Sequence, residues 1–324
     1  MNRAAAPPSN FHFHDLQPPP DDFRAAVIAG LRSQPRSLSP KYFYDARGST
    51  LFDAITALPE YYLTRTEIGL LRRYGDEMAT LLGRDTVLLE FGSGSDVKVR
   101  LLLDALRPHA YLPLDISATH LRRAAAAIAA DHARLQVHAL CVDYTCPFPL
   151  PATLDGHRRA AFFPGSSIGN FEPQQACRLL RGIADLLGPH GNLLIGVDLK
   201  KAHAELHAAY NDAAGVTAAF NLNLLHRMRA ELDAQVDPAG FRHHAFYNAE
   251  AGRIEMHLLA TDRQQVRIGD EGFVFGAGDG IHTENAYKYS LDEFGALAAR
   301  AGLRTRRVWC DDGERYSVHC LQPA

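Results

Sequence analysis

Short apolar runs alternate with longer helical patterns between residue 86 and about residue 200, and this alternation limits the fold more than any other feature of the chain. Strands are expected at residues 86–91, 111–116, 137–142, 160–163 and 192–199. Apolar residues at helical spacing predict helices over residues 97–107, 119–132 and 173–187. This alternation predicts an α/β fold in which helices cover both faces of a parallel sheet.

Local signals mark the ends of two of these helices. Ser117 stands just before the helix expected over residues 119–132 and is a candidate N-cap. Pro173 suits the first turn of the next helix, and Gly188 followed by Pro189 is expected to end it.

The C-terminal part of the chain adds an antiparallel element. Ser290 and Glu293 have the spacing of a capping box, which predicts a helix over residues 291–301. Strands at residues 304–310 and 315–321 are joined by a DDGE turn that favours a hairpin. A parallel sheet that ends in an antiparallel hairpin is the outline expected of a Rossmann-like methyltransferase fold.

The segment from residue 201 to residue 286 departs from the alternation and predicts a second domain. It contains two helical patterns followed by two strand patterns, at residues 202–214, 218–234, 241–248 and 253–261. We interpret it as an insertion that forms a discontinuous substrate-binding lid domain together with residues 21–62. Residues 63–200 and 287–324 then form the cofactor-binding methyltransferase domain, and the proline-rich residues 1–20 form a flexible N-terminal arm.

Composition narrows the functional class. The 324 residues are 47% hydrophobic and 22% charged, with a formal net charge of −3, so nucleic acid is not an expected partner. No apolar stretch approaches the roughly 20 residues needed to span a membrane, and the N-terminus has no signal-peptide core. The five cysteines form no C-x-x-C pair, which is typical of a reduced cytoplasmic protein. The sequence does not predict an oligomeric state, and a monomer is compatible with it.

A glycine-rich turn follows the first predicted strand. Glu90 precedes it, Gly92 lies in it, and Val97 occupies the position of a third glycine in a nicotinamide-binding motif. Asp115 ends the second predicted strand, 23 residues after Gly92, where a carboxylate can accept hydrogen bonds from ribose hydroxyls. A plain tight turn and a helix cap are the alternative explanations of these two features.

A further carboxylate, Asp143, ends the third predicted strand beside Tyr144 and is suitably placed for an adenine amino group. Because the carboxyl ends of parallel strands meet at one edge of a sheet, Asp115 and Asp143 are expected to converge there. The set predicts a nucleoside-containing cofactor.

Three other segments are long and distinctive. They are residues 41–67, which run from KYFYD to TRTE, residues 165–170 (GSSIGN) and residues 209–221 (AYNDAAGVTAAFN). Through them the chain resembles the histidine Nα-methyltransferases of ergothioneine biosynthesis, which convert L-histidine to its trimethylbetaine, hercynine. The resemblance runs from about residue 39 to the C-terminus and implies that S-adenosylmethionine is the cofactor.

The resemblance also implies roles for individual residues. The expected cofactor-binding residues are Gly92, Lys98, Asp115, Asp143 and Tyr144. The α-amino and carboxylate groups of the substrate are expected to meet Tyr61, Asn170 and Tyr210, the first two being the candidate catalytic residues, with Tyr62 as the alternative to Tyr61. Tyr44 and Phe52 are expected near the reacting nitrogen, and Glu284, Met256 and Ala286 near the imidazole.

The chemistry is consistent with these residue types. Methyl transfer from a sulfonium needs a neutral amine in line with the methyl group, and positioning supplies most of the rate. Neutral groups such as Asn170 and Tyr61 can hold an amine without favouring its ammonium form. Aromatic faces can then hold the quaternary product, at about 0.5–2 kcal/mol per contact.

One position departs from the family pattern. Ala286 stands where the family commonly has a serine that donates a hydrogen bond to the imidazole. A lost buried partner costs about 1–3 kcal/mol, so methylation of another amino acid or small amine, such as an aromatic one, is the alternative function. A catalytically silent cofactor-binding regulator is a third hypothesis.

The sixteen histidines suggest no metal site by their spacing. The chain has no H-E-x-x-H motif and no paired Cys/His pattern, and His243 and His244 would point to opposite faces of a strand. Structural or surface roles are expected for these histidines.

Overall fold

The computed structural model describes residues 8–16, 23–93 and 96–324, and the chain divides into two compact units. Unit one comprises Met1–Pro18, Arg65–Leu199 and Tyr289–Ala324, and unit two comprises Pro19–Thr64 and Lys200–Lys288. Apart from Met1–Pro18, which falls in the expected N-terminal arm, these bounds lie within two residues of the two discontinuous domains expected from the sequence. The ligand that each unit binds remains a prediction.

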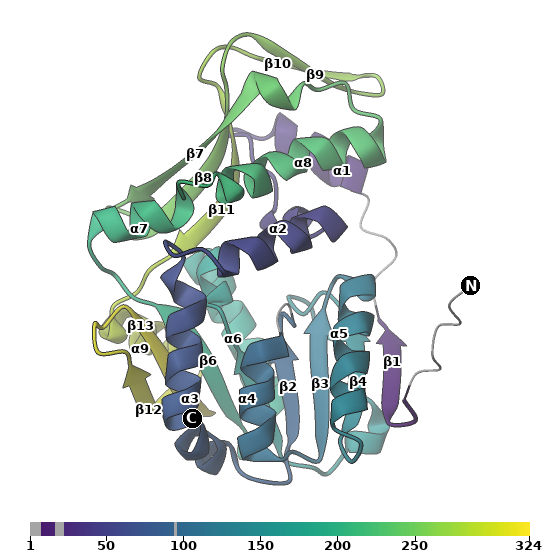
Figure 1. Ribbon diagram of the computed structural model, residues 1–324, viewed down its shortest axis with the longest axis vertical. Helices are drawn as coiled ribbons and strands as arrows, with labels where there is room; N and C mark the ends of the chain where they lie inside the picture. The colour runs from purple at the N-terminus through teal and green to yellow at the C-terminus, as the bar shows by residue number, and fades with distance from the viewer. Residues whose placement is uncertain (1–7, 17–22, 94–95) are drawn as a thin grey trace. The chain divides into compact units, whose positions relative to one another are not determined.

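Unit one is built around an eight-stranded sheet with the order β1-β4-β3-β2-β5-β6-β13-β12 (Figure 1). Its strands are β1 (Phe11–Asp15), β2 (Val87–Phe91), β3 (Ala110–Asp115), β4 (Gln136–Cys141), β5 (Arg159–Phe163), β6 (Asn192–Asp198), β12 (Leu303–Cys310) and β13 (Tyr316–Pro323). The first six strands in this order are parallel, and β13 and β12 form the antiparallel hairpin. The predicted fold class is confirmed.

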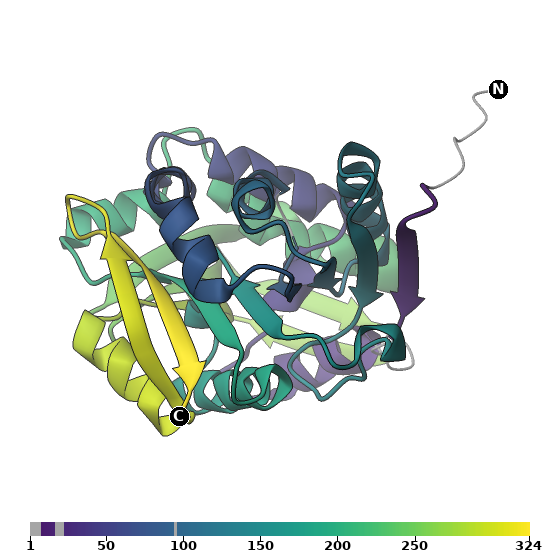
Figure 2. The same cartoon turned by 90° about the horizontal axis from the view of Figure 1, so that it is seen from below.

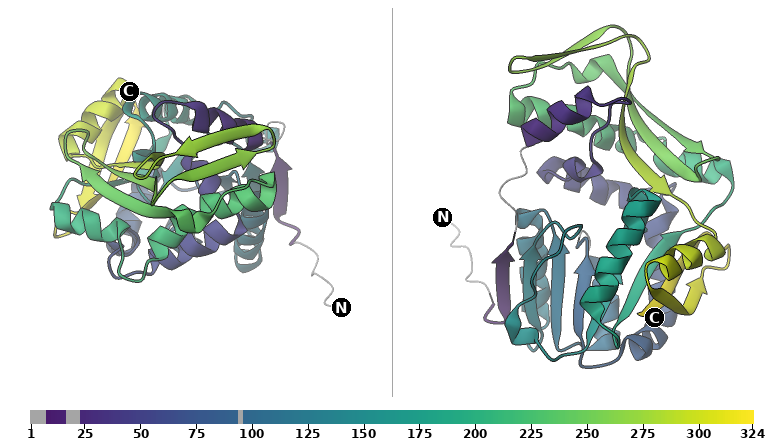
Figure 3. Two further views of the ribbon diagram at one scale, coloured as in Figure 1. Left: turned by 90° about the horizontal axis from the view of Figure 1, so that it is seen from above. Right: turned by 180° about the vertical axis from the view of Figure 1, so that it is seen from behind.

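Helices cover both faces of this sheet. They are α3 (Tyr62–Leu82), α4 (Asp96–Leu106), α5 (Ala118–Asp131), α6 (Pro173–Leu187) and α9 (Leu291–Arg300), with short 3-10 turns η2 (Ala152–Leu154) and η3 (Ser167–Asn170). The views from below and behind show α3, α4 and α5 on one face and α6 and α9 on the other (Figures 2 and 3). This double covering explains why every residue of β2 and of β6 is buried, and why most residues of these strands are apolar.

Unit two combines a small sheet with helices. Its helices are α1 (Phe23–Arg32), α2 (Ala46–Thr56), α7 (His203–Tyr210) and α8 (Val216–Leu232), with 3-10 turns η1 (Pro40–Phe43) and η4 (Pro238–Gly240). Its strands are β7 (Phe241–Asn248), β8 (Arg253–Ala260), β9 (Gln264–Ile268), β10 (Glu271–Phe275) and β11 (Gly280–Tyr287). Strands β11, β8 and β7 form an antiparallel sheet, and β9 pairs with β10 in a separate hairpin (Figure 3).

Helix α8 packs on one face of the three-stranded sheet through polar contacts as well as apolar ones. The Asn221 side chain donates to the His257 carbonyl oxygen at 3.0 Å and accepts from the Thr283 hydroxyl at 2.8 Å. On the other side of α8, Asn223 donates to Asp45, the N-cap of α2, at 2.8 Å. The helix therefore links α2 to the sheet within unit two.

The flexible-arm prediction is wrong for part of residues 1–20. Phe11–Asp15 form β1, which pairs in parallel register with β4 from Phe11 opposite Val137 to Asp15 opposite Cys141. A partner more than 120 residues away supplies the backbone hydrogen bonds, so the flanking prolines did not prevent a strand. Residues 1–7 and 17–20 of the predicted arm lie outside the described residues.

One further prediction needs correction, and three strands were not predicted. Ser117 occupies the N-cap position of α5, but its side chain makes no capping hydrogen bond among the described residues. Its backbone N–H instead donates to the Asp115 carboxylate at 2.8 Å. The sequence also gave no indication of β9, β10 or β11. The turn between β9 and β10 contains Gly269, whose φ is +59°, and a register shift between His282 and Glu284 interrupts the alternation of β11.

Candidate functional site

The predicted cofactor residues of unit one gather at the carboxyl ends of β2, β3 and β4. Gly92 follows β2 with φ +77°, and its N–H donates to the Leu114 carbonyl oxygen at 2.9 Å. Asp115 ends β3, and Asp143 and Tyr144 follow β4. The parallel register, with Asp115 opposite Cys141, brings the two carboxylates to one edge of the sheet.

Electrostatics at this edge fit a polar ligand. Burial raises the pKa of Asp115, and backbone hydrogen bonds from Ser117 and Ile116, together with the nearby His120, offset this desolvation only in part. Burial also raises the pKa of Tyr144, with Asp115 and Asp143 adding to the shift. Two hydrogen bonds donated by a diol would stabilise the charged form of this partly buried carboxylate. The arrangement therefore fits the ribose of S-adenosylmethionine.

Glu90, near the end of β2 and just before the glycine-rich turn, is a third carboxyl group in this region. Burial raises its pKa to about 8, and the Tyr111 hydroxyl donates to its Oε2. Its Oε1 is buried without a hydrogen-bond partner among the described groups. Ser93 of the turn also acts on this carboxyl group and lowers its pKa, which only partly offsets the effect of burial.

Lys98 forms a buried ion pair that the sequence analysis did not foresee. Its Nζ lies 2.6 Å from Glu67 Oε2, and the Glu67 side chain is fully buried. The Glu67 oxygens also accept from the Gly165 N–H at 2.9 and 3.1 Å. A Cβ at Gly196 would collide with Glu67 Oε1, so the glycine on β6 makes room for this carboxylate.

The Glu67 contact fixes the start of the loop that carries Asn170. Ser166 lies in the left-handed region with φ +58°, and its hydroxyl accepts from the Asp198 N–H at 2.9 Å. Asn170 ends η3 in this loop and belongs to unit one. In the sequence, Glu67 was indicated only as the last residue of the TRTE segment of the family resemblance. The burial of the Glu67 side chain could not be predicted from the sequence.

The aromatic residues predicted near the reacting amine cluster in unit two. The Phe52 ring centroid lies 5.6 Å from that of Tyr44 and 6.5 Å from that of Tyr61. Phe220 of α8, which was not predicted, completes the group at 6.0 Å from Phe52 and 5.8 Å from Tyr44. Phe220 falls inside the distinctive 209–221 segment, which was the available signal.

A second group in unit two surrounds Tyr210 and Glu284. The buried Lys288 donates from Nζ to the Tyr210 hydroxyl at 3.0 Å, and its positive charge acts on Glu284. Burial outweighs this charge and raises the pKa of Glu284 to about 7. Met256 lies opposite Glu284 in the sheet register, and the buried Ala286 follows two residues later on β11. Lys288 was missed because a lone lysine gives no sequence signal of burial.

The residue pair Tyr61 and Tyr62 can now be distinguished. Tyr61 faces Phe52, whereas the fully buried Tyr62 accepts at its hydroxyl from Lys201 Nζ at 2.6 Å. This arrangement favours Tyr61 over Tyr62 as the residue of the aromatic cluster, and its role stays a prediction.

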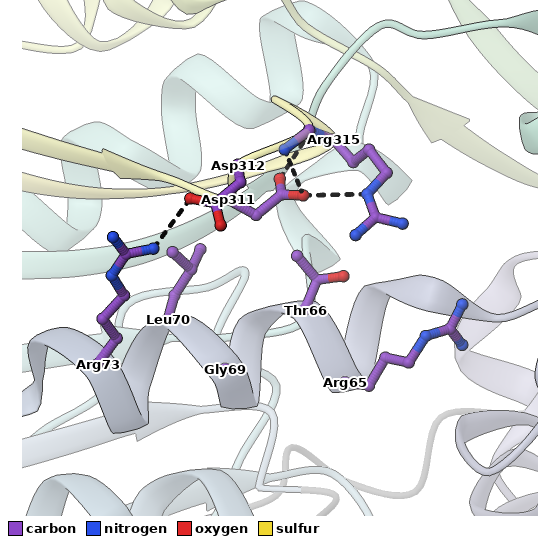
Figure 4. Close-up of a pocket in the computed structure, with 9 residues that line it drawn as sticks. Arg65, Thr66, Gly69, Leu70, Arg73, Asp311, Asp312 and Arg315 are labelled. Carbon is purple, nitrogen blue, oxygen red and sulfur yellow. Dashed lines mark hydrogen bonds and ion pairs between the residues drawn. The ribbon is translucent and has the colours of Figure 1, made fainter.

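A surface groove of about 410 Å³ in unit one is unrelated to these groups (Figure 4). It lies between α3 and the turn of the β12–β13 hairpin, where Arg73 pairs with Asp312 at 2.9 Å and Arg315 with Asp311 at 3.0 Å. Of the described residues predicted to bind cofactor or substrate, none lines it. Two of its three arginines are thus paired with its two aspartates.

The chain matches one described protein family over most of its length. The model of a family described as histidine-specific, S-adenosylmethionine-dependent methyltransferases matches residues 23–323. The chain belongs to this family. The resemblance inferred from the sequence and the dependence on S-adenosylmethionine are thereby confirmed.

Relatives agree with this assignment. The chain is 44% identical over 294 residues to a histidine N-alpha-methyltransferase of Mycolicibacterium smegmatis, covering 89% of this chain and 91% of that protein. It is 42% identical over 301 residues to the protein of the same name from Mycobacterium tuberculosis, covering 91% and 93%. Among solved structures, the CcbJ methyltransferase of Streptomyces caelestis matches 78% of this chain and 95% of its own, with 15% identity and a TM-score of 0.46.

Among the described residues, no helix combines the length and the apolar character that a bilayer crossing requires.

The cofactor residues provide a direct test. An Asp115→Ala variant is expected to bind S-adenosylhomocysteine about 10- to 100-fold more weakly, because it loses charge-assisted hydrogen bonds of about 1.5–3 kcal/mol. Isothermal titration calorimetry measures this affinity. Asp131→Ala is the matched control, since Asp131 is an exposed residue of α5 that pairs with Arg100. Equal affinities in the two variants would remove Asp115 from the site.

Proposed function

We propose that this methyltransferase transfers methyl groups from S-adenosylmethionine to the α-amino nitrogen of L-histidine and continues to the trimethylated betaine, hercynine, for ergothioneine biosynthesis. The observation that carries the proposal is the buried Glu284 on β11, with its pKa raised to about 7 beside Met256. A carboxyl group in such surroundings suits a ligand that offers an N–H, as an imidazole does.

The proposal assigns a ligand to each unit. Asp115, Asp143, Tyr144, Lys98 and the turn at Gly92 would hold the cofactor, whose sulfonium supplies an activated methyl group. Residues of unit two would hold the amino acid, with Asn170 added from the family resemblance. The division of the chain into two compact units supports this assignment.

The residues of this chain would act by orientation. Tyr61 and Asn170 would accept from or donate to the α-amino group as neutral partners, which leaves the amine lone pair available once the proton has left to solvent. Tyr210, held by Lys288 at its hydroxyl, would orient the carboxylate. The rings of Tyr44, Phe52 and Phe220 would face the growing methylammonium, whose loss of N–H donors makes aromatic contact the remaining attraction.

A second candidate, α-N-methylation of another amino acid, is favoured by one observation. Ala286 is buried on the same strand as Glu284 and lacks the hydroxyl donor expected at its position. The side-chain end of the pocket therefore decides between the two candidates.

Turnover decides the function. Each of the twenty free amino acids is incubated with the protein and S-adenosylmethionine, and products are identified by mass spectrometry. We expect mono-, di- and trimethylhistidine, with methyl groups located on the α-nitrogen by fragmentation. Preferred turnover of tyrosine or tryptophan would support the second candidate, and absence of any methylated product would contradict both.

A further inference from the structure

The outer face of the three-stranded sheet of unit two carries a cluster that neither the cofactor nor the substrate proposal uses. Glu255 and His257 are two residues apart on β8, so their side chains project from the same face. His282 of β11 lies directly opposite His257 in the register. Met256 and Glu284 occupy the alternate positions and project from the other face.

The three side chains come close enough to share one ion. One potential ligand atom from each residue lies within 4.8 Å of those of the other two. The rings of His257 and His282 have centroids 5.0 Å apart, and His257 Nε2 lies 3.1 Å from Glu255 Oε2. Ligands of a tetrahedral zinc ion are separated by roughly 3.3 Å, so small side-chain rotations suffice.

The carboxylate is already oriented for coordination by one oxygen. Glu255 Oε1 accepts from Asn248 Nδ2 and from Arg253 Nε, both at 2.9 Å. These two donors hold the group in place and leave Oε2 directed at the imidazole of His257. Support of a ligand through its second oxygen is the usual arrangement around metal-binding carboxylates.

The imidazoles are also supported. Phe246 stacks on His257 with ring centroids 5.6 Å apart and an interplanar angle of 18°. His282 Nε2 lies 2.9 Å from Asn285 Oδ1, an oxygen that can contribute a further ligand. Glu255 is buried, whereas both histidines are partly exposed, so an ion can reach the cluster from solvent.

We propose that Glu255, His257 and His282 bind one divalent transition-metal ion, with Zn²⁺ the favoured occupant. Two imidazole nitrogens and one carboxylate oxygen are ligands that Zn²⁺ accepts readily, and they do not suit Mg²⁺ or Ca²⁺. The ion would join β8 to β11, the two strands that carry Met256 and Glu284. This site could not be predicted from the sequence. Glu255 and His257 have an E-x-H spacing on one strand, and His282 follows 25 residues later on another strand.

The test uses the full chain without a histidine tag, stripped of metal by a chelator. Zn²⁺ is titrated by calorimetry, and Co²⁺ by visible absorbance, which is intense when cobalt is tetrahedral and weak when it is octahedral in water. We expect one ion per chain and a Tm that rises by several degrees at saturating Zn²⁺. Neither measurement depends on the amino-acid substrate, so the outcome is separate from that of the proposed function.

Variants locate the ion. His257→Ala and His282→Ala are each expected to lower Zn²⁺ affinity at least about a hundredfold, and Glu255→Gln by about 10- to 100-fold. His226→Ala is the control, because His226 of α8 experiences the positive charges of Arg47 and Arg229 and is a poor cation ligand. An unchanged Tm of the metal-free protein shows that each variant is folded, and His282→Gln repeats the test with a smaller change in packing.

One competing location is tested in parallel. His203 and His207 are four residues apart on α7, with ring centroids 6.0 Å apart, and form an exposed pair. If His203→Ala abolishes Zn²⁺ binding while His282→Ala retains it, the proposal is overturned. The same holds if the wild-type protein shows no saturable Zn²⁺ binding.

Discussion

A Glu67→Ala variant is expected to lose about 3–5 kcal/mol of unfolding free energy, the largest stability change predicted for a single substitution in unit one. The substitution leaves Lys98 as an unpaired charge whose side chain is only 10% exposed. It also removes the acceptor of the Gly165 N–H. Both groups were desolvated in the folded state, so neither regains its full hydration when the carboxylate is removed.

Urea unfolding monitored by Trp309 fluorescence measures this loss. Trp309 is the single tryptophan and lies on β12, where its Nε1 donates to Glu77 of α3 at 3.0 Å. Asp76→Ala is the matched control, since Asp76 is an exposed residue of the same helix.

A double variant, Glu67→Met with Lys98→Met, separates the two contributions. It should recover much of the lost stability, because no buried charge is left unpaired. A loss below about 1 kcal/mol in Glu67→Ala would show instead that the pair behaves like an exposed one.

The second large effect concerns substrate choice. Glu284→Ala is expected to lower kcat/KM for histidine by about 10- to 150-fold, the equivalent of one charged hydrogen bond of about 1.5–3 kcal/mol. Affinity for S-adenosylhomocysteine should stay unchanged. Glu271→Ala serves as the control, because Glu271 is a carboxylate of unit two that pairs with Arg32 at the surface.

Two further measurements sharpen this prediction. Ala286→Ser restores a hydroxyl donor and should lower KM for histidine. Because burial raises the pKa of Glu284 to about 7, its carboxylate accepts an imidazole N–H above that pH, and this contribution is lost as the pH falls below about 7. The ratio of wild-type to Glu284→Ala activity should therefore fall on acidification. A constant ratio, with no response to Ala286→Ser, would count against histidine as the substrate.

The sequence predicted unit one well because its signals are local. The helix Pro173–Leu187 has the predicted bounds, since Pro173 begins it and Gly188 with φ +66° ends it. Strand β1 escaped prediction because its stability comes from pairing with β4 and not from its own composition. Strand β11 escaped because the register shift at His282/Glu284 breaks the two-residue period on which strand prediction depends.

The same contrast between local sequence signals and tertiary contacts applies to the residues of the candidate site. Asp115 and Asp143 could be predicted because a position at a strand end is a property of the local sequence. Glu67 and Lys288 could not, since a buried charge depends on a partner that only the tertiary structure supplies. The metal ligands proposed above are a further example, because strand register brings His282 to His257.

The discontinuity of unit two has a consequence for synthesis of the protein on the ribosome. Residues 23–64 leave the ribosome early, but their packing partners, including Phe220 against Phe43 at 4.5 Å and Arg227 bonded to the Tyr42 carbonyl oxygen at 2.9 Å, are translated much later. At about 5–20 residues per second, completion of residue 288 follows that of residue 64 by roughly 10–45 s. During this interval the apolar residues Phe23, Val27 and Leu31 of α1 cannot pack into a completed unit two. Nascent chains of this protein should therefore engage chaperones through their N-terminal segment until α8 has emerged.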